Sequence, residues 1–135
     1  MDFFRTLAIA AAGLRAQTGR MRVISENIAN AGTTASDPGG QPYRRKLVTF
    51  ANQLDRALGA ETAYVKGISV DKSEFTRRYE PGHPAADGEG YVLVSNVNSL
   101  IEMTDMREAQ RSYEANLKVI QSSRSMIQQT IDILR

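Results

Sequence analysis

The last third of the chain carries a long apolar repeat that constrains how the rest can fold. Between residues 103 and 134, a line of positions can be drawn whose successive spacings alternate between three and four residues. Most of these positions carry apolar or aromatic side chains, and the stretch contains no Gly or Pro. The positions on this line are Met103, Met106, Gln110, Tyr113, Leu117, Ile120, Arg124, Ile127, Ile131 and Leu134. Such a repeat predicts a helix, roughly 48 Å long at ~1.5 Å per residue, with a narrow seam that packs on another helix.

Residues 2–30 carry a second heptad pattern on two neighbouring lines. One line consists of Leu7, Leu14, Met21 and Ile28, and the other consists of Phe3, Ala10, Gln17 and Ile24. Gly13 and Gly19 weaken an isolated helix by ~1 kcal/mol each relative to Ala, so this helix needs partners in order to form. Asn30 and Gly32 supply a stop signal, since both residue types adopt the left-handed conformation readily.

Two helices with apolar seams at the two ends of one chain most simply pack on each other. The predicted fold is therefore mainly α, with long N- and C-terminal helices in an antiparallel coiled-coil-like pair and a small β-containing middle. We expect residues 1–32 with 96–135 to form a terminal helical (coiled-coil) domain, and residues 33–95 to form an irregular middle segment with short β-strands. Ser95 or Asn96 is expected to cap the start of the C-terminal helix.

The middle segment contains two turn-rich stretches, residues 32–45 and 80–90, in which Gly, Pro, Ser, Thr and Asp are frequent. Short strands are predicted at residues 46–50, 65–71 and 91–94, with residues 75–79 continuing a hairpin. Residues 51–63 allow two alternatives, which are a short helix around Leu54 and Leu58 or a mobile loop.

The composition excludes several function classes. The chain has 135 residues, a net charge of +2 and no Cys, which excludes a disulfide framework, thiol catalysis and Cys-ligated metal. Its one basic cluster, Arg44 to Lys46, is too small to indicate a nucleic-acid partner. No apolar run approaches the ~18 residues of a membrane span. The N-terminus is a poor secretory signal, because no basic stretch precedes its apolar run.

No catalytic or cofactor-binding motif is present, so we expect no enzyme activity, no cofactor and no metal site. The chain lacks a Gly-rich phosphate loop, a nucleophile elbow and an HExxH sequence. The lone His83 lies in a Pro-Gly-His-Pro turn, where a structural role is expected because metal sites need several converging ligands. Asp87 and Glu89 lie close to it in the sequence, which leaves a weak cation site as the alternative.

Apolar heptads occur in ordinary helical cores as well as in assemblies. A second apolar line, formed by Val119, Met126 and Ile133, runs down the C-terminal helix, and one two-helix contact cannot cover both lines. We therefore expect a further chain to cover the second line. The candidate helix-packing and assembly residues are Leu7, Leu14, Met21, Ile24, Asn27, Ile28, Asn30, Met103, Met106, Tyr113, Asn116, Leu117, Val119, Ile120, Met126, Ile127, Ile131 and Leu134.

Two further alternatives stay open at this point. Asn27 and Asn30 lie one turn apart, where they provide either helix capping with solvent exposure or amide hydrogen bonds across a subunit contact. A soluble coiled-coil adapter that binds one helical partner in the cytoplasm is the alternative to a larger assembly. The adapter predicts a folded small oligomer in isolation, whereas an assembly subunit predicts poorly ordered termini until it assembles, because heptad helices without partners are marginal.

Beyond these patterns, longer motifs resemble a known family. The stretch from Ala12 to Arg45, with its Asn-Ile-Ala-Asn sequence, Thr-rich turn and Tyr-Arg-Arg segment, resembles the N-terminal signature of bacterial flagellar rod and hook proteins. The stretch from Asn96 to Asn116 resembles the matching C-terminal motif, although Thr104 and Arg107 stand where more apolar residues are usual. The length of the first loop and the residues from Tyr79 to Tyr91 are similar to the rod protein C branch of that family.

This resemblance implies a structural subunit of the proximal rod of the bacterial flagellar basal body. Such subunits assemble into a helical tubular shaft in the periplasm, which transmits motor torque to the distal rod and hook. The implied partners are other copies of the chain, other proximal and distal rod proteins, an adaptor protein between the rod base and the membrane ring, and the flagellar type III export apparatus. The resemblance also implies export without a cleaved signal peptide, no direct membrane span and no nucleic-acid partner.

Overall fold

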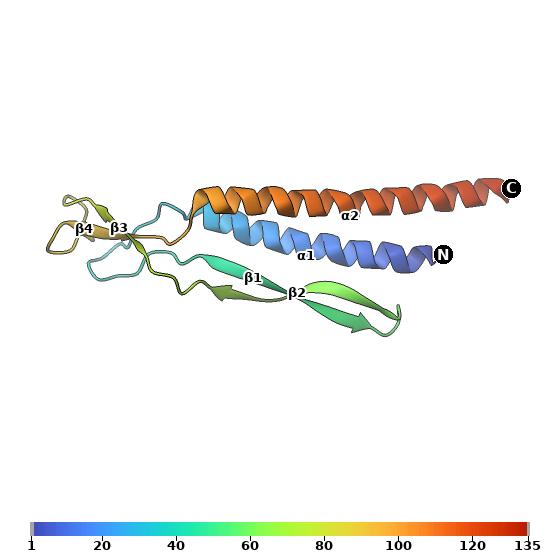
Figure 1. The fold of residues 1–135 in the computed structure, drawn as a ribbon, viewed down its shortest axis with the longest axis horizontal. Helices are drawn as coiled ribbons and strands as arrows, with labels where there is room; N and C mark the ends of the chain where they lie inside the picture. The colour runs from blue at the N-terminus through green and yellow to red at the C-terminus, as the bar shows by residue number, and fades with distance from the viewer. Residues whose placement is uncertain (1, 135) are drawn as a thin grey trace. The chain divides into compact units, whose positions relative to one another are not determined.

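The computed structural model describes residues 2–134, which form two long helices and two two-stranded sheets (Figure 1). The elements in chain order are α1 (Phe3–Ala29), β1 (Lys46–Asp55), β2 (Ala60–Val70), β3 (Thr76–Tyr79), β4 (Tyr91–Val94) and α2 (Ser99–Ile133). The predicted mainly α class, with a helix at each end and a small β-containing middle, is confirmed. Within the described residues, neither helix has a stretch that is both long and apolar enough to cross a membrane.

Polar side chains fix both ends of α1. At its start, the Asp2 carboxylate accepts a hydrogen bond from the Arg5 backbone N–H (3.1 Å), which satisfies one of the free donors of the first turn. At its end, the Asn30 side-chain amide donates to the Glu26 carbonyl (2.8 Å), and the Thr33 hydroxyl donates to the Asn30 carbonyl (2.8 Å). These bonds occupy carbonyls that a helix end would leave free, and the predicted stop near Asn30 is confirmed.

The second helix begins one residue after Asn98, because Asn98 caps it. The Asn98 side-chain oxygen accepts hydrogen bonds from the backbone N–H groups of Leu100 (3.0 Å) and Ile101 (3.4 Å). The prediction that Ser95 or Asn96 is the cap is therefore wrong. Both of those side chains bond elsewhere, Ser95 within the turn before the helix and Asn96 to the segment after β2.

Residues 51–63 form neither a short helix nor a loop, but complete a hairpin of β1 and β2 (Figure 1). The Asp55 carboxylate accepts backbone hydrogen bonds from Ala57 (2.9 Å) and Leu58 (3.3 Å). Gly59 follows with a φ of 58°, a left-handed conformation that favours glycine. The Asp side chain and the left-handed Gly close a tight turn, so both strands are longer than predicted.

The third strand pairs with β4 in an antiparallel ladder, which corrects the expectation that residues 75–79 continue a hairpin after the strand at residues 65–71. Tyr79 lies opposite Tyr91, and their rings meet edge to face with centroids 5.3 Å apart. Gly90 has a φ of 84°, and a Cβ there would lie 2.9 Å from the Tyr79 ring, so both the backbone and the packing favour Gly. The apolar core of this region consists of Ala35, Ala85 and Val92.

Contacts divide the described chain into two compact units, each of which contains parts of both helices. Unit 1 comprises residues 2–21, 48–67 and 107–134, and unit 2 comprises residues 22–47 and 68–106. Each unit thus brings together segments that lie far apart in the sequence. The predicted division separates the two helices from the middle segment, whereas each unit contains parts of both helices and of the middle segment. The predicted division therefore stays a prediction.

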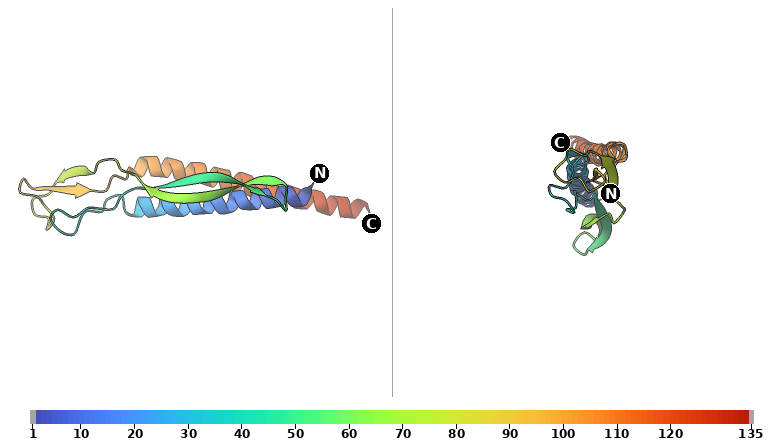
Figure 2. Two further views of the ribbon diagram at one scale, coloured as in Figure 1. Left: turned by 90° about the horizontal axis from the view of Figure 1, so that it is seen from below. Right: turned by 90° about the vertical axis from the view of Figure 1, so that its left-hand side faces the viewer.

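In unit 1, small residues of α1 allow other elements to approach closely (Figures 1 and 2). A Cβ added at Gly13 would lie 2.9 Å from the side-chain nitrogen of Asn116 on α2. A Cβ added at Gly19 would lie 3.2 Å from the Val65 side chain on β2. The buried side chains of the two helices in this unit are also small, and they include Ala10, Ala12, Ala16, Ala109 and Ser123.

We predict that Gly13→Leu destabilises the chain, because the added side chain needs space that Asn116 occupies. Overpacking of this kind costs about 1–3 kcal/mol, which should appear as a lower urea midpoint in circular dichroism of the purified chain. Gly32→Ala is the control, since a Cβ at Gly32 meets no atom within 4 Å. A Gly13→Leu midpoint equal to that of the wild type would contradict the close approach.

Candidate functional site

A buried amide at the end of α1 connects separate stretches of unit 2. Asn27 is 1% exposed, and its side-chain nitrogen donates to the Glu102 carboxylate (3.0 Å) and to the Lys46 carbonyl (2.8 Å). Its side-chain oxygen accepts hydrogen bonds from the Tyr43 hydroxyl (2.8 Å) and from the Lys46 backbone N–H (2.9 Å). An amide offers two donors and two acceptor positions, and all of them are used here, so the buried Asn27 is fully satisfied.

The Arg45 guanidinium compensates the charge of the buried Glu102 carboxylate. Glu102 is also 1% exposed, and its second oxygen accepts a hydrogen bond from Nε of Arg45 at 2.5 Å. The same guanidinium lies 3.4 Å from the Asp105 carboxylate and 3.8 Å from the Asp71 carboxylate. A carboxylate removed from water needs both a cationic partner and hydrogen bonds, and Glu102 has both.

Asn96 extends these contacts to the segment after β2. Its side-chain oxygen accepts a hydrogen bond from the Arg45 backbone N–H (2.8 Å), and its nitrogen donates to the Asp71 carbonyl (3.2 Å) and the Ser73 hydroxyl (3.0 Å). Arg44 donates to the carbonyls of Asp71 (3.3 Å) and Ser73 (3.2 Å). We refer to the connected side chains as the polar network, whose members are Asn27, Tyr43, Arg45, Asn96 and Glu102.

The surroundings of the network shift the pKa values of two groups. Burial raises the pKa of Tyr43, and the charge of Glu26 raises it further, so the phenol stays protonated and can donate. Hydrogen bonds from Ser73, first of all from its backbone N–H, hold the pKa of Asp71 below its ordinary value, and the charge of Arg45 adds to this effect. Near neutral pH both groups therefore have the protonation states that the contacts require.

The predicted packing residues of α1 lie on its covered sides. Ile24 is buried, and the half-buried positions are Leu7, Leu14, Met21, Ile28 and Asn30. The capping alternative assumes that Asn27 is exposed to solvent. Asn27 is instead buried, and its side-chain amide forms hydrogen bonds within the chain. Asn30 bonds to the Glu26 carbonyl of its own helix, which is the behaviour that the capping alternative predicts.

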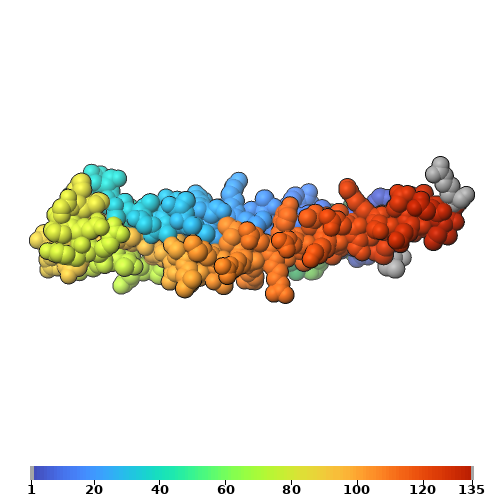
Figure 3. Space-filling view, turned by 90° about the horizontal axis from the view of Figure 1, so that it is seen from above, coloured from blue at the N-terminus to red at the C-terminus, as the bar shows by residue number. Residues whose placement is uncertain are grey.

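On α2 the structure divides the predicted residues into two groups. Half-buried positions are Met106, Tyr113, Asn116, Ile120 and Ile127, whereas exposed positions are Met103, Leu117, Val119, Met126, Ile131 and Leu134. The positions that α2 buries are Glu102, Ala109 and Ser123. The packing of the chain on itself therefore uses a small and polar line of α2 and leaves large apolar side chains uncovered. In the space-filling view, one side of α2, coloured orange to red, forms part of the outer surface (Figure 3).

Reasoning from the sequence missed the network apart from Asn27. A single sequence gives no sign that a Tyr and an Arg in a turn-rich stretch meet a Glu nearly sixty residues later. One signal was available, because the buried or half-buried line of α2 recurs every seven residues without any large apolar side chain. That line is Glu102, Ala109, Asn116 and Ser123.

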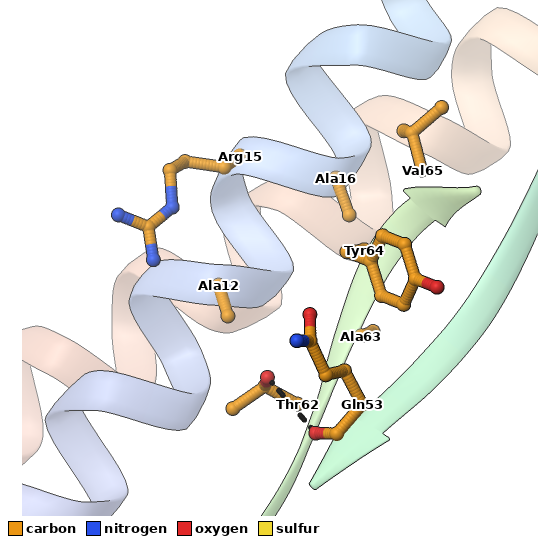
Figure 4. Close-up of a pocket in the computed structure, with 8 residues that line it drawn as sticks. All are labelled: Ala12, Arg15, Ala16, Gln53, Thr62, Ala63, Tyr64 and Val65. Carbon is orange, nitrogen blue, oxygen red and sulfur yellow. Dashed lines mark hydrogen bonds between the residues drawn. The ribbon is translucent and has the colours of Figure 1, made fainter. Parts of the chain in front are cut away.

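A hollow of about 360 Å³ lies between α1 and the hairpin in unit 1 (Figure 4). The residues that line it are Ala12, Arg15, Ala16, Gln53, Thr62, Ala63, Tyr64 and Val65. Arg15 is the one charged side chain among them, and the Thr62 hydroxyl donates to the Gln53 carbonyl (3.3 Å). General acid–base catalysis needs an acid and a base within reach of a substrate, and this lining contains neither a carboxylate nor a His.

His83 has a structural role in the turn before β4. Its Nδ1 accepts a hydrogen bond from the Ala85 backbone N–H (3.0 Å), so Nε2 carries the proton and donates to the Thr34 hydroxyl oxygen (3.1 Å). The Asp87 carboxylate accepts a hydrogen bond from the Tyr91 backbone N–H (2.9 Å). In the part of the chain that the structure describes, no group of three or more His, Cys, Asp or Glu side chains could hold a metal ion.

The chain is similar to known proteins over nearly its whole length. A family model described as flagellar basal body rod FlgEFG protein C-terminal matches residues 89–133, which include Asn96 and Glu102. Flagellar basal-body rod protein FlgC of Agrobacterium fabrum is 54% identical over 127 residues, covering 94% of this chain and 91% of the relative. FlgC of Salmonella typhimurium is 42% identical with 98% of both chains covered. FlgC of Borreliella burgdorferi is 40% identical, covering 100% of this chain and 99% of the relative.

We predict that Arg45→Ala strongly destabilises unit 2, because Glu102 would keep a buried charge without its cationic partner. Removal of one partner from a buried ion pair costs about 3–5 kcal/mol, which urea unfolding of the purified chain would measure. Arg78→Ala is the matched control, since the Arg78–Glu80 pair (2.9 Å) is exposed and should contribute only about 0–1 kcal/mol. Equal losses for the two substitutions would show that the network does not support the fold.

Proposed function

The chain belongs to the FlgC family of flagellar basal-body rod proteins, and we propose that it assembles into the helical tubular shaft of the proximal rod. As a member of this family it is a structural component of the rod in the flagellar basal body, with a role in motility and not an enzyme. The proposal adds the helical lattice, the contacts that build it and the transmission of motor torque to the distal rod and hook.

The observation that carries the proposal is the set of large apolar side chains that α2 leaves exposed. The set consists of Leu100, Ile101, Met103, Leu117, Val119, Met126, Ile131, Ile133 and Leu134. Burial of a side chain of this size contributes about 1.5–3 kcal/mol relative to exposure, so covering even part of the set favours association. Large apolar side chains that stay exposed along a helix mark protein contacts, and neighbouring rod subunits are the partners that family membership suggests.

An antiparallel coiled-coil-like pairing of α1 and α2 is part of the proposal. In unit 1, Gly13 lies against Asn116, and the Arg20 guanidinium lies 3.5 Å from the Glu108 carboxylate. From the first contact to the second, the chain advances by seven residues along α1, from Gly13 to Arg20. Along α2 it goes back by eight residues, from Asn116 to Glu108. An antiparallel heptad pair has steps of about this size, which supports the pairing.

In the proposed assembly, residues 1–32 and 96–135 act as the terminal helical domain that packs against neighbouring subunits. The middle segment, residues 33–95, makes the outer lateral contacts. A head-to-tail contact whose rotation does not close generates a helical fibre, and long helices that contact several neighbours make such a fibre stiff. Torque then passes through many modest contacts and not through one site.

The proposed partners follow from the same family. The rod subunits assemble with other rod components, and we propose further copies of the chain, other proximal and distal rod proteins, a rod-base adaptor and the type III export apparatus as the specific partners. Export into the periplasm occurs without a cleaved signal peptide in this proposal. The absence of Cys from the chain is compatible with passage through an export channel in an unfolded state.

We predict that Leu117→Asp leaves export intact but stops rod completion. Leu117 is exposed in the single chain, so the substitution should not prevent folding, but an unpaired charge buried in a subunit contact costs several kcal/mol. The measurement is the yield of hook–basal bodies and the swimming of cells that carry the variant. Ser125→Asp adds the same charge at an exposed position of α2 whose neighbours three and four residues away are polar, so this variant should remain close to wild type. Wild-type motility of Leu117→Asp would sink the prediction.

A further inference from the structure

Within unit 1, α2 extends past the start of α1 (Figures 1 and 2). Gly13 lies beside Asn116, and the two helices run in opposite directions with the same rise of ~1.5 Å per residue. Phe3, the first residue of α1, precedes Gly13 by ten residues, so it lies level with Met126, ten residues after Asn116. Residues 127–134, which we call the overhang, therefore lie beyond the reach of α1.

The hairpin of unit 1 does not cover the overhang either. The Arg5 guanidinium, in the first turn of α1, donates a hydrogen bond to the carbonyl of Gly59. Gly59 lies in the turn between β1 and β2, so this bond holds the tip of the hairpin beside the start of α1. The exposed fractions agree with an uncovered helix end, since Ile131 is 53% and Leu134 is 82% exposed.

The overhang continues the apolar line with which α2 packs inside unit 1. Tyr113 and Ile120 on this line are half-buried. Ile127, Ile131 and Leu134 follow on the same line at spacings of four and three. Ile127 is still half-buried, whereas Ile131 and Leu134 are exposed. Because the apolar seam of α2 continues past the end of α1, we expect another helix to pack on the rest of the seam. That helix should also carry apolar residues at heptad spacing.

The charge of the overhang restricts the chemistry of this partner. Asp132 is its one charged side chain, and the Asp132 carboxylate accepts a hydrogen bond from the Gln128 amide (3.0 Å) of the same helix. A surface with so little charge offers nothing to hold a polyanion or a strongly charged peptide. Its contact with a partner must be apolar, and salt should weaken it little.

We propose that the overhang is a joint between rod subunits, in which an amphipathic helix of the next subunit takes the place that α1 has along the rest of α2. This proposal rests on the proposed function, which is assembly into the rod. It specifies one of the contacts between subunits, the one made by the overhang. The joint extends the helical seam of one subunit into the next, so that the apolar contact between helices continues across the boundary between subunits.

Site-specific photo-cross-linking in cells that build flagella tests the joint on the full chain. The probe is p-benzoylphenylalanine in place of Ile131, and the control is the same residue in place of Asp132, which points away from the apolar line. After irradiation, basal bodies are purified and the cross-linked peptides are mapped by mass spectrometry. We expect position 131 to cross-link to the apolar face of a helix in another rod subunit, in several-fold higher yield than position 132 and equally at low and high salt.

The outcomes separate the joint from rod membership. If basal bodies contain the chain but position 131 reacts only with its own chain, or no more than position 132, the joint is overturned and rod membership stands. Absence of the chain from basal bodies would overturn both. As a second measurement, Ile131→Asp should reduce the number of complete rods several-fold with unchanged export, whereas Ile131→Leu should not, and equal rod numbers for the two variants would contradict the joint.

Discussion

The buried carboxylate of Glu102 is the interaction on which the rest of unit 2 depends. A charge with 1% exposure is stable only because Arg45 supplies the opposite charge and Asn27 a hydrogen bond, and these partners come from the turn-rich stretch before β1 and from the end of α1. The start of α2 is thereby fixed to the end of α1 and to the first strand. The hydrogen bonds also require one particular alignment of these segments, since a shift of one residue would leave buried polar groups without partners.

In unit 2 this alignment turns the side of α2 that carries Glu102 toward the rest of the unit. With Glu102 facing inward, Ala109 and Ser123 also face inward at multiples of seven residues, and these small side chains allow close packing. The larger apolar residues of the helix, such as Leu117 and Ile131, are left exposed. The polar contacts thus fix the register of unit 2, while large apolar side chains of α2 stay exposed, and the proposed assembly would cover them.

The sequence predicts the two helices well, because heptads of this length and the stop at Asn30 are strong local signals. It does not predict the β1–β2 hairpin, since the turn depends on the Asp55 side chain and on a left-handed Gly59, whereas the residues around them also suit a short helix. The polar network could not be found from spacing, because its members become neighbours only in the folded chain. Part of the predicted seam of α2, such as Met103 and Leu117, lies one residue away from the buried line of Glu102 and Asn116 for a related reason. Hydrophobicity alone predicts that the large apolar residues of α2 face inward. In the structure Tyr113 and Ile120 are half-buried, whereas Leu117 and Ile131 are exposed.

A cryo-EM map of intact basal bodies tests the account most directly. We expect this chain to lie in the periplasmic shaft, with Arg45 and Asn27 in contact with Glu102 as in the single chain, and with another subunit covering Leu117 and Ile131. A map in which the chain is absent from the shaft, or in which those apolar side chains of α2 face solvent in the assembled rod, would contradict it.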